Sequence, residues 1–216
     1  MQKRRRWGKV VAFVLGLAPL FWLAWRAWNH RLTANPLEFI THYTGDWTLR
    51  MVVFTLCITP FRKILNWPDL IRYRRMIGLF AFFYGCLHFL TYLWFDKFLS
   101  DQLDISDILV DVGKRRYITV GFTAFVLMIP LAVTSTTGWI RRLGGKRWAQ
   151  LHRLIYITAV CGVIHYLWLV KSDIRLPVFY GFLVTVLLAW RLWFTRRTAQ
   201  TARSPAVRKS AEPVAP

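Results

Sequence analysis

The chain has 216 residues, of which 56% are hydrophobic and 17% aromatic, and its mean hydropathy is +0.35. A soluble domain of this length is more polar, so this composition excludes an ordinary soluble enzyme or binding module. The net charge of +20 would suggest nucleic-acid binding in a soluble protein. Here the basic residues lie in short clusters between apolar runs, which is typical of a membrane protein and argues against nucleic-acid binding.

Apolar runs long enough to cross a bilayer recur along the chain. They predict an all-α integral membrane protein, a six-transmembrane-helix bundle that forms one domain over residues 1–197. The tail, residues 198–216, is polar and contains proline, and we expect a disordered cytoplasmic tail there. The second span is the weakest, because Asp46 and Arg50 lie near its start. The predicted spans are 9–28, 46–62, 76–95, 117–134, 151–170 and 176–195.

The basic residues also predict the orientation. Most of the 30 basic residues lie at the N-terminus, between spans two and three, between spans four and five, and at the end of the chain. Only Asp69 and Glu212 of the ten acidic residues lie there. The positive side faces the cytoplasm, so both termini are predicted to be cytoplasmic, which requires an even number of spans. The basic start is also compatible with a signal peptide, but no small-residue cleavage site follows, so we expect a retained first helix.

The segments between the spans differ in charge. The longest outer segment, residues 96–116, carries five aspartates, and the sequence allows either a solvated loop or a docking surface for an outer partner. A basic cluster on the cytoplasmic side is suited to lipid headgroups, to a flavin phosphate, or to docking a cytosolic reductase. This cluster comprises Arg72, Arg74, Arg75, Arg141, Arg142, Lys146 and Arg147.

Two histidines lie at matched depths in predicted spans. His88 is seven residues before Phe95 and His165 is six before Lys171, which places them roughly 10 Å and 9 Å from the outer ends. Spans three and five run in the same direction, so these imidazoles can face each other. Polar side chains at such depth are costly and usually functional, and heme iron accepts an imidazole at each axial position. The alternative is two unrelated histidines bonded to helix carbonyls.

His152 lies thirteen residues before His165, about 20 Å closer to the cytoplasmic end. The partner of His152 in a two-heme arrangement would lie at Arg74 or Arg75, and arginine is not a heme ligand. His152 therefore uses another ligand, shares a cofactor differently, serves another role, or is an ordinary interfacial histidine. His30 and His42 are expected to be exposed residues of the first outer loop.

Three segments carry a family resemblance. They are RRMIGLFAFFYGCLHFLTYLWFD (74–96), KRRYITVGFTAFVLMIPLAVTS (114–135) and GKRWAQLHRLIYITAVCGVIHYLWLVK (145–171). They closely resemble the heme-binding membrane subunit of bacterial periplasmic protein-methionine-sulfoxide reductase systems. That subunit is ferric-reductase-like and belongs to a superfamily that includes the NADPH oxidases. The resemblance covers nearly the whole chain except the tail.

The resemblance implies a b-type heme, with FMN as a candidate second cofactor, in the bacterial inner membrane. His88, His152 and His165 match the histidines of the family and are the cofactor-binding and metal-binding candidates. Electrons would come from the cytoplasmic side and pass to a periplasmic molybdopterin catalytic subunit, forming a heterodimer that repairs methionine sulfoxide in envelope proteins. The chain departs from the oxidase pattern at Arg74 and Arg75, which argues against a second heme. It has no nucleotide-binding domain, so the donor is a quinol or a cytosolic flavin reductase.

The chain itself is expected to be a non-catalytic electron-transfer subunit, because nothing in its sequence resembles a sulfoxide-reducing site. Three alternatives follow from the same residues. The first is a self-sufficient ferric or oxygen transmembrane reductase. The second is a histidine-based proton-coupled transporter, and the third is a structural assembly factor without a cofactor.

Overall fold

The computed structural model describes residues 2–94, 110, 112–170 and 172–210, and these residues form helices and short connections without any strand. Each predicted span coincides with one long helix, so the all-α prediction is confirmed. The elements in chain order are α1 (Gln2–Trp28), α2 (Pro36–Ile64), the 3-10 turn η1 (Pro68–Leu70), α3 (Ile71–Tyr92), α5 (Arg116–Val133), α6 (Thr137–Leu151), α7 (Leu154–Leu169) and α8 (Arg175–Ser210).

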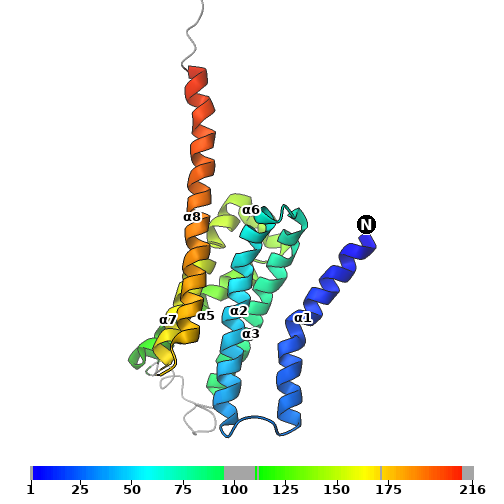
Figure 1. Cartoon of the computed structure of the whole chain (residues 1–216), viewed down its shortest axis with the longest axis vertical. Coiled ribbons are helices and arrows are strands. Elements are labelled where there is room, and N and C mark those ends of the chain that lie inside the picture. The colour runs from blue at the N-terminus through cyan, green and yellow to red at the C-terminus, as the bar shows by residue number, and fades with distance from the viewer. Residues whose placement is uncertain (1, 95–109, 111, 171, 211–216) are drawn as a thin grey trace, which may run out of the picture.

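Two helix pairs form the centre of the bundle. α2 packs mainly on α3, α5 packs mainly on α7, and α8 covers both α7 and α2. α1 lies at the edge beside α3, and α8 extends well past the bundle (Figure 1). The start of α1 and the end of α8 lie toward the same end of the bundle, where α6 also lies (Figure 1).

The core lies where α2 meets its neighbours. α2 contributes Val52 and Leu56, which are 2% and 3% exposed. Ala81 of α3 and Ala159 of α7 have no exposed surface at all. Small residues at these positions let helix backbones approach closely, which is how helices associate where lipid removes the hydrophobic driving force.

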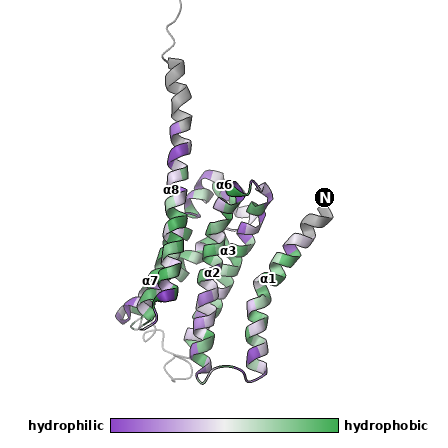
Figure 2. Ribbon diagram, in the orientation of Figure 1, coloured by the Kyte–Doolittle hydropathy of each residue, from purple (hydrophilic) through white to green (hydrophobic). Residues whose placement is uncertain are grey.

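Several helices expose apolar surface, as membrane helices do. Trp7–Trp28, Arg116–Val133 and Arg175–Thr198 are each long and apolar enough to cross a membrane. α6 and α7, bent by 41° at their junction, add a fourth candidate if they count as one span. Figure 2 shows α8 as mostly hydrophobic beside the bundle and hydrophilic where it leaves it. The chain is thus a multi-pass membrane protein, in which hydropathy alone identifies three or four of the six predicted crossings.

α2 begins ten residues before the predicted start of span two. Asn35 caps the helix: its Oδ1 accepts a hydrogen bond from the Glu38 backbone N–H at 3.3 Å, and its Nδ2 donates to Glu38 Oε2 at 3.1 Å. Pro36 follows at the first helical position, where its missing N–H costs nothing. The first outer loop is therefore short, and His42 lies inside a helix.

Two further segments differ from expectation. The connection before α7 forms helix α6, with its break at Gly144, which has a φ of 73°. α8 continues to Ser210, past residue 198, where the sequence placed the start of a disordered tail; alanine, arginine and glutamine in 198–210 favour helix, and the disordered tail stays a prediction. Residues 211–216 and most of the aspartate-rich segment 96–116 lie outside the described residues, so the predictions there stand untested.

Two tyrosine hydroxyls hold α1 to the bundle. Tyr84, only 1% exposed, donates to the Gly16 carbonyl at 2.8 Å, and Tyr43 donates to the Pro19 carbonyl at 3.0 Å. Pro19 lies inside α1 and has no N–H, so the helix is weakest in this turn. The two bonds therefore anchor α1 to the bundle at the turn where its own backbone hydrogen bonding is weakest.

We expect Tyr84→Phe to loosen α1 without unfolding the bundle. The ring still packs, but the lost hydrogen bond costs roughly 0.5–1.5 kcal/mol. Hydrogen exchange of the purified protein should become faster in α1 and stay unchanged in α5 and α7. Tyr156→Phe, remote from α1, is the matched control, and equal exchange in the two variants would contradict this role for the Tyr84 hydroxyl.

Candidate functional site

The structure brings His88 of α3 and His165 of α7 together at one level of the bundle. Their ring centres are 6.1 Å apart and their planes make an angle of 76°. The sequence placed these residues at similar depth, and the structure adds that they face each other across a cavity between the two helix pairs.

Each ring forms a hydrogen bond to a backbone carbonyl of the helix beside it. His88 Nδ1 lies 2.9 Å from the Thr41 carbonyl of α2, and His165 Nδ1 lies 2.7 Å from the Tyr117 carbonyl of α5. A carbonyl can only accept, so Nδ1 donates in both rings, and the neutral imidazole then carries its lone pair on Nε2. Both histidines are thus held in the tautomer that a metal ion requires at Nε2.

The separation of the rings fits one metal ion between them. Two metal–imidazole bonds of about 2 Å, on opposite sides of one ion, place the ring centres roughly 6 Å apart once the nitrogen-to-centre distance is added. The observed 6.1 Å agrees with this. Among the described residues no group of three or more histidine, cysteine or acidic side chains could hold a bare metal ion. The pair therefore suits an ion whose other ligands come from a bound macrocycle, as in heme.

Two glycines make room for the histidines. A Cβ at Gly45 would lie 3.0 Å from His88 Cε1, and a Cβ at Gly121 would lie 2.5 Å from His165 Nδ1. Each glycine comes four residues after the residue whose carbonyl accepts the bond, Thr41 or Tyr117. A side chain four residues on lies on the same helix face as that residue, so only a glycine leaves the carbonyl open to the ring.

This repeated arrangement was missed by reasoning from the sequence. In α2 and in α5 a glycine follows four residues after the residue whose carbonyl accepts the histidine bond. This shared spacing was the signal that the sequence offered. Gly85 and Gly162 show a second regularity, since each lies three residues before a histidine, on the same helix face. Both glycines line the cavity, and because they have no side chain they leave space about one helical turn from the His88 and His165 rings.

The cavity has a volume of about 400 Å³, within the range of ligand pockets. Its wall is largely apolar and includes aromatic side chains: Phe125 stacks on Phe89 with ring centres 5.0 Å apart. Leu49 of α2 and Met128 of α5 add to the apolar wall, and α2 also contributes the polar side chains Glu38 and Asp46. The residues that line it include Glu38, Thr41, His42, Gly45, Asp46, Gly85, His88, Phe89, Phe125, Gly162 and His165.

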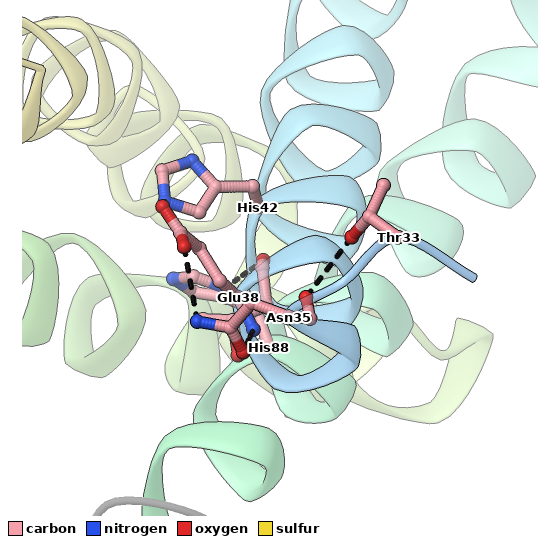
Figure 3. Close-up of polar contacts among 6 residues, drawn as sticks. Thr33, Asn35, Glu38, His42 and His88 are labelled. Carbon is pink, nitrogen blue, oxygen red and sulfur yellow. Dashed lines mark hydrogen bonds and ion pairs between the residues drawn. The ribbon is translucent and has the colours of Figure 1, made fainter.

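His42 belongs to this cavity, so its assignment to an exposed loop was wrong. The early start of α2 places it one turn after Glu38, whose carboxylate lies 4.0 Å from His42 Nε2. Figure 3 shows Glu38 and His42 at the start of α2, with the His88 ring beside that helix. His30, by contrast, lies in the turn after α1 and is exposed, as expected.

The two charges that weakened span two neutralise each other. Arg50 lies 3.5 Å from the Asp46 carboxylate, and its Nε donates to the Tyr180 hydroxyl of α8 at 3.1 Å. The guanidinium also lies 4.9 Å from the Trp47 ring centre. A charged pair at membrane depth is tolerated when it is paired and hydrogen-bonded in this way. Asp46 thereby contributes a polar group to the cavity wall without an unpaired charge.

His152 lies apart from the cavity, at the junction of α6 and α7. Its Nε2 is 3.1 Å from Thr134 Oγ1, and Trp148 stacks on its ring with centres 4.0 Å apart. The Thr134 hydroxyl donates to the Pro130 carbonyl at 2.6 Å, so Nε2 of a neutral His152 is the donor to Oγ1. This is the opposite tautomer to that of His88 and His165, and it leaves no lone pair on Nε2.

The chain is similar in sequence to one protein family and to several named proteins. Residues 44–163, which include His88 and His152 but end before His165, match the family described as ferric reductase like transmembrane component. The chain is 53% identical over 188 residues to the protein-methionine-sulfoxide reductase heme-binding subunit MsrQ of Herminiimonas arsenicoxydans, covering 86% of this chain and 84% of that protein.

Two more relatives carry the same name. The one from Rhodospirillum rubrum is 45% identical over 205 residues, which cover 95% of this chain and 97% of that protein. The one from Caulobacter vibrioides is 47% identical over 182 residues, which cover 84% and 85%. These matches span nearly the whole of each protein. The chain therefore belongs to the ferric-reductase-like transmembrane family, in the group of protein-methionine-sulfoxide reductase heme-binding subunits.

Proposed function

We propose that this chain binds a b-type heme between His88 and His165 and relays electrons to the catalytic subunit of a protein-methionine-sulfoxide reductase. The observation that carries the proposal is the pair of imidazoles with ring centres 6.1 Å apart and with Nδ1 of each ring bonded to a carbonyl. The relatives support both parts, since each is named a heme-binding subunit of that reductase.

When bound, heme supplies an iron that takes up and gives off one electron at a time. The residues of the chain set the conditions for this. His88 and His165 would hold the heme through Nε2, and the bound group would then supply electron transfer and no substrate site. The aromatic wall around Phe89 and Phe125 limits water. This arrangement suits electron transfer, and sulfoxide reduction would fall to the partner subunit.

The topology that fits this function has six crossings, formed by α1, α2, α3, α5, α7 and α8. The start of α1 and the end of α8 lie toward the same end of the bundle, which supports placing both termini in the cytoplasm (Figure 1). The cavity then lies toward the periplasmic side of the inner membrane. Its partner there would be a periplasmic molybdopterin catalytic subunit in a heterodimer, with residues 96–116 as a candidate docking segment.

Electrons would enter from the cytoplasmic side. The proposed donor is a quinol or a cytosolic flavin reductase, with FMN as a candidate second cofactor. His152 lies on that side, in a stack with Trp148. We assign it to the electron entrance and not to an axial position, because its Nε2 is engaged by Thr134.

The alternatives find less support. A self-sufficient ferric or oxygen reductase needs an open metal position or an outer substrate pocket, and a heme held by both His88 and His165 would not offer the first. A proton-coupled transporter or a cofactor-free assembly factor needs no pair of histidines with a metal-ready tautomer. Neither matches the names of relatives that are about half identical over most of the chain.

We expect His88→Ala and His165→Ala each to abolish the heme absorption band of the purified protein, because each removes one axial nitrogen. His30→Asn, which changes an exposed histidine outside the cavity, should retain the band at full intensity. Absorption spectra at equal protein concentration measure this. A full heme content in either alanine variant would remove that residue from the proposed site.

Gly121→Ala should weaken heme binding although Gly121 is not itself a proposed ligand. The new Cβ would meet His165 Nδ1 at 2.5 Å and force the ring away from the Tyr117 carbonyl. Loss of such support to a metal ligand lowers affinity about 10- to 100-fold, which heme transfer to an apo-protein acceptor measures. Gly145→Ala has nothing within 4 Å of the new Cβ and is the matched control. Equal heme retention in both would show that the close approach at Gly121 is unimportant.

His152→Ala should leave the heme spectrum intact and slow reduction of the protein by a cytoplasmic-side donor. The reason is that His152 contacts Thr134 and Trp148 and not the cavity. The spectrum and the rate of reduction by a flavin reductase with NADH are measured on the same preparation. Loss of the heme band in this variant would instead make His152 a ligand.

A further inference from the structure

Four basic side chains meet at the end of the bundle where α8 leaves it. Arg62 and Lys63 end α2, Arg74 lies in the first turn of α3, and Arg191 lies in α8. All four are partly buried, whereas Arg75, next to Arg74, is exposed. Three helices thus direct partly buried basic groups to this end of the bundle, whereas the neighbouring Arg75 is exposed to solvent.

Aromatic side chains hold these groups. The Arg191 guanidinium carbon lies 4.8 Å from the ring centre of Tyr156 in α7. Lys63 Nζ lies 2.8 Å from the ring centre of Phe194 and 5.9 Å from that of Trp190, both in α8. Arg74 lies within electrostatic range of Arg62, Arg191 and Tyr156. The positive groups are therefore fixed near one another and do not spread into solvent.

Among the described residues, the ion pairs do not join these four side chains to an acidic group. The one acidic residue described at this end is Asp69, and it pairs with the exposed Arg72 at 3.0 Å. Like charges that are partly buried without a counterion repel each other and lose hydration, and both effects destabilise the fold. A negative group from outside the chain would remove that cost.

We propose that Arg62, Arg74 and Arg191 form a binding site for a phosphate group. Guanidinium groups present paired N–H donors that match two phosphate oxygens at once, and such bonds are about twice as strong as neutral ones. Tyr156, Trp190 and Phe194 supply apolar surface beside the charges, suited to the rest of a phosphate-bearing molecule.

Two sources share this chemistry. One is the headgroup of an anionic phospholipid, which the position of the site at the end of the apolar part of α8 favours (Figure 2). The other is a soluble phosphate ester arriving from the aqueous side. The site is separate from the His88–His165 cavity, and its existence does not depend on the function proposed for that cavity.

The test uses the full chain in nanodiscs of phosphatidylcholine, with the midpoint of thermal unfolding as the readout. In one arm phosphatidylglycerol replaces part of the phosphatidylcholine. In the other arm glycerol 3-phosphate is titrated into discs of phosphatidylcholine alone. Wild type, Arg74→Gln and Arg191→Gln are compared with Arg75→Ala, the matched control on an exposed neighbour.

Stabilisation by phosphatidylglycerol alone identifies a lipid site, and saturable stabilisation by glycerol 3-phosphate identifies a soluble ester. In either case Arg74→Gln and Arg191→Gln should weaken the apparent affinity about tenfold, which corresponds to the loss of one charge-assisted bond. Arg75→Ala should bind like the wild type. Stabilisation by neither anion, or an equal loss in Arg75→Ala, overturns the proposal. Arg191→Gln keeps the test decisive if Arg74→Gln does not fold.

Discussion

The hydrogen bond from a histidine Nδ1 to the carbonyl of a neighbouring helix is the interaction on which the cavity depends. It fixes the ring, selects the tautomer and leaves the lone pair on Nε2, so one contact supplies both orientation and chemistry. The contact exists only because Gly45 and Gly121 leave the carbonyl uncovered. The packing of α2 on α3 and of α5 on α7 is therefore part of the site, because a shift of either pair moves a ring.

The same packing explains why α2 is the least apolar of the predicted spans. It lies among α3, α7 and α8, so its side chains meet protein more than lipid. That position allows Asp46 and Arg50 to form a pair completed by Tyr180, which would be costly on a lipid-facing helix. α1 and α8, which expose more of their surface, are correspondingly more apolar along their membrane-facing length (Figure 2).

The sequence predicted the helices and the histidine pair because both depend on local quantities, namely apolar length and depth along a helix. The start of α2 was misplaced because Asp46 and Arg50 hid the apolar periodicity, although Asn35, Pro36 and Glu38 were a readable helix start. His42 was lost from the site for the same reason. The glycines escaped notice because their role lies in what a neighbouring helix places against them, which requires knowing which helices pack together.

The two ends of the bundle differ in a way that bears on electron flow. At the cavity, carbonyl acceptors give two histidines a free Nε2, whereas His152 donates from Nε2 to Thr134 and stacks on Trp148. Arg74, near His152, stands where a symmetric second site would need a ligand. A positive group there raises the electrical potential locally, which favours negatively charged reduced species on that side. The asymmetry thus fits the proposed function, in which electrons enter at the end near His152 and the His88–His165 pair lies nearer the other end.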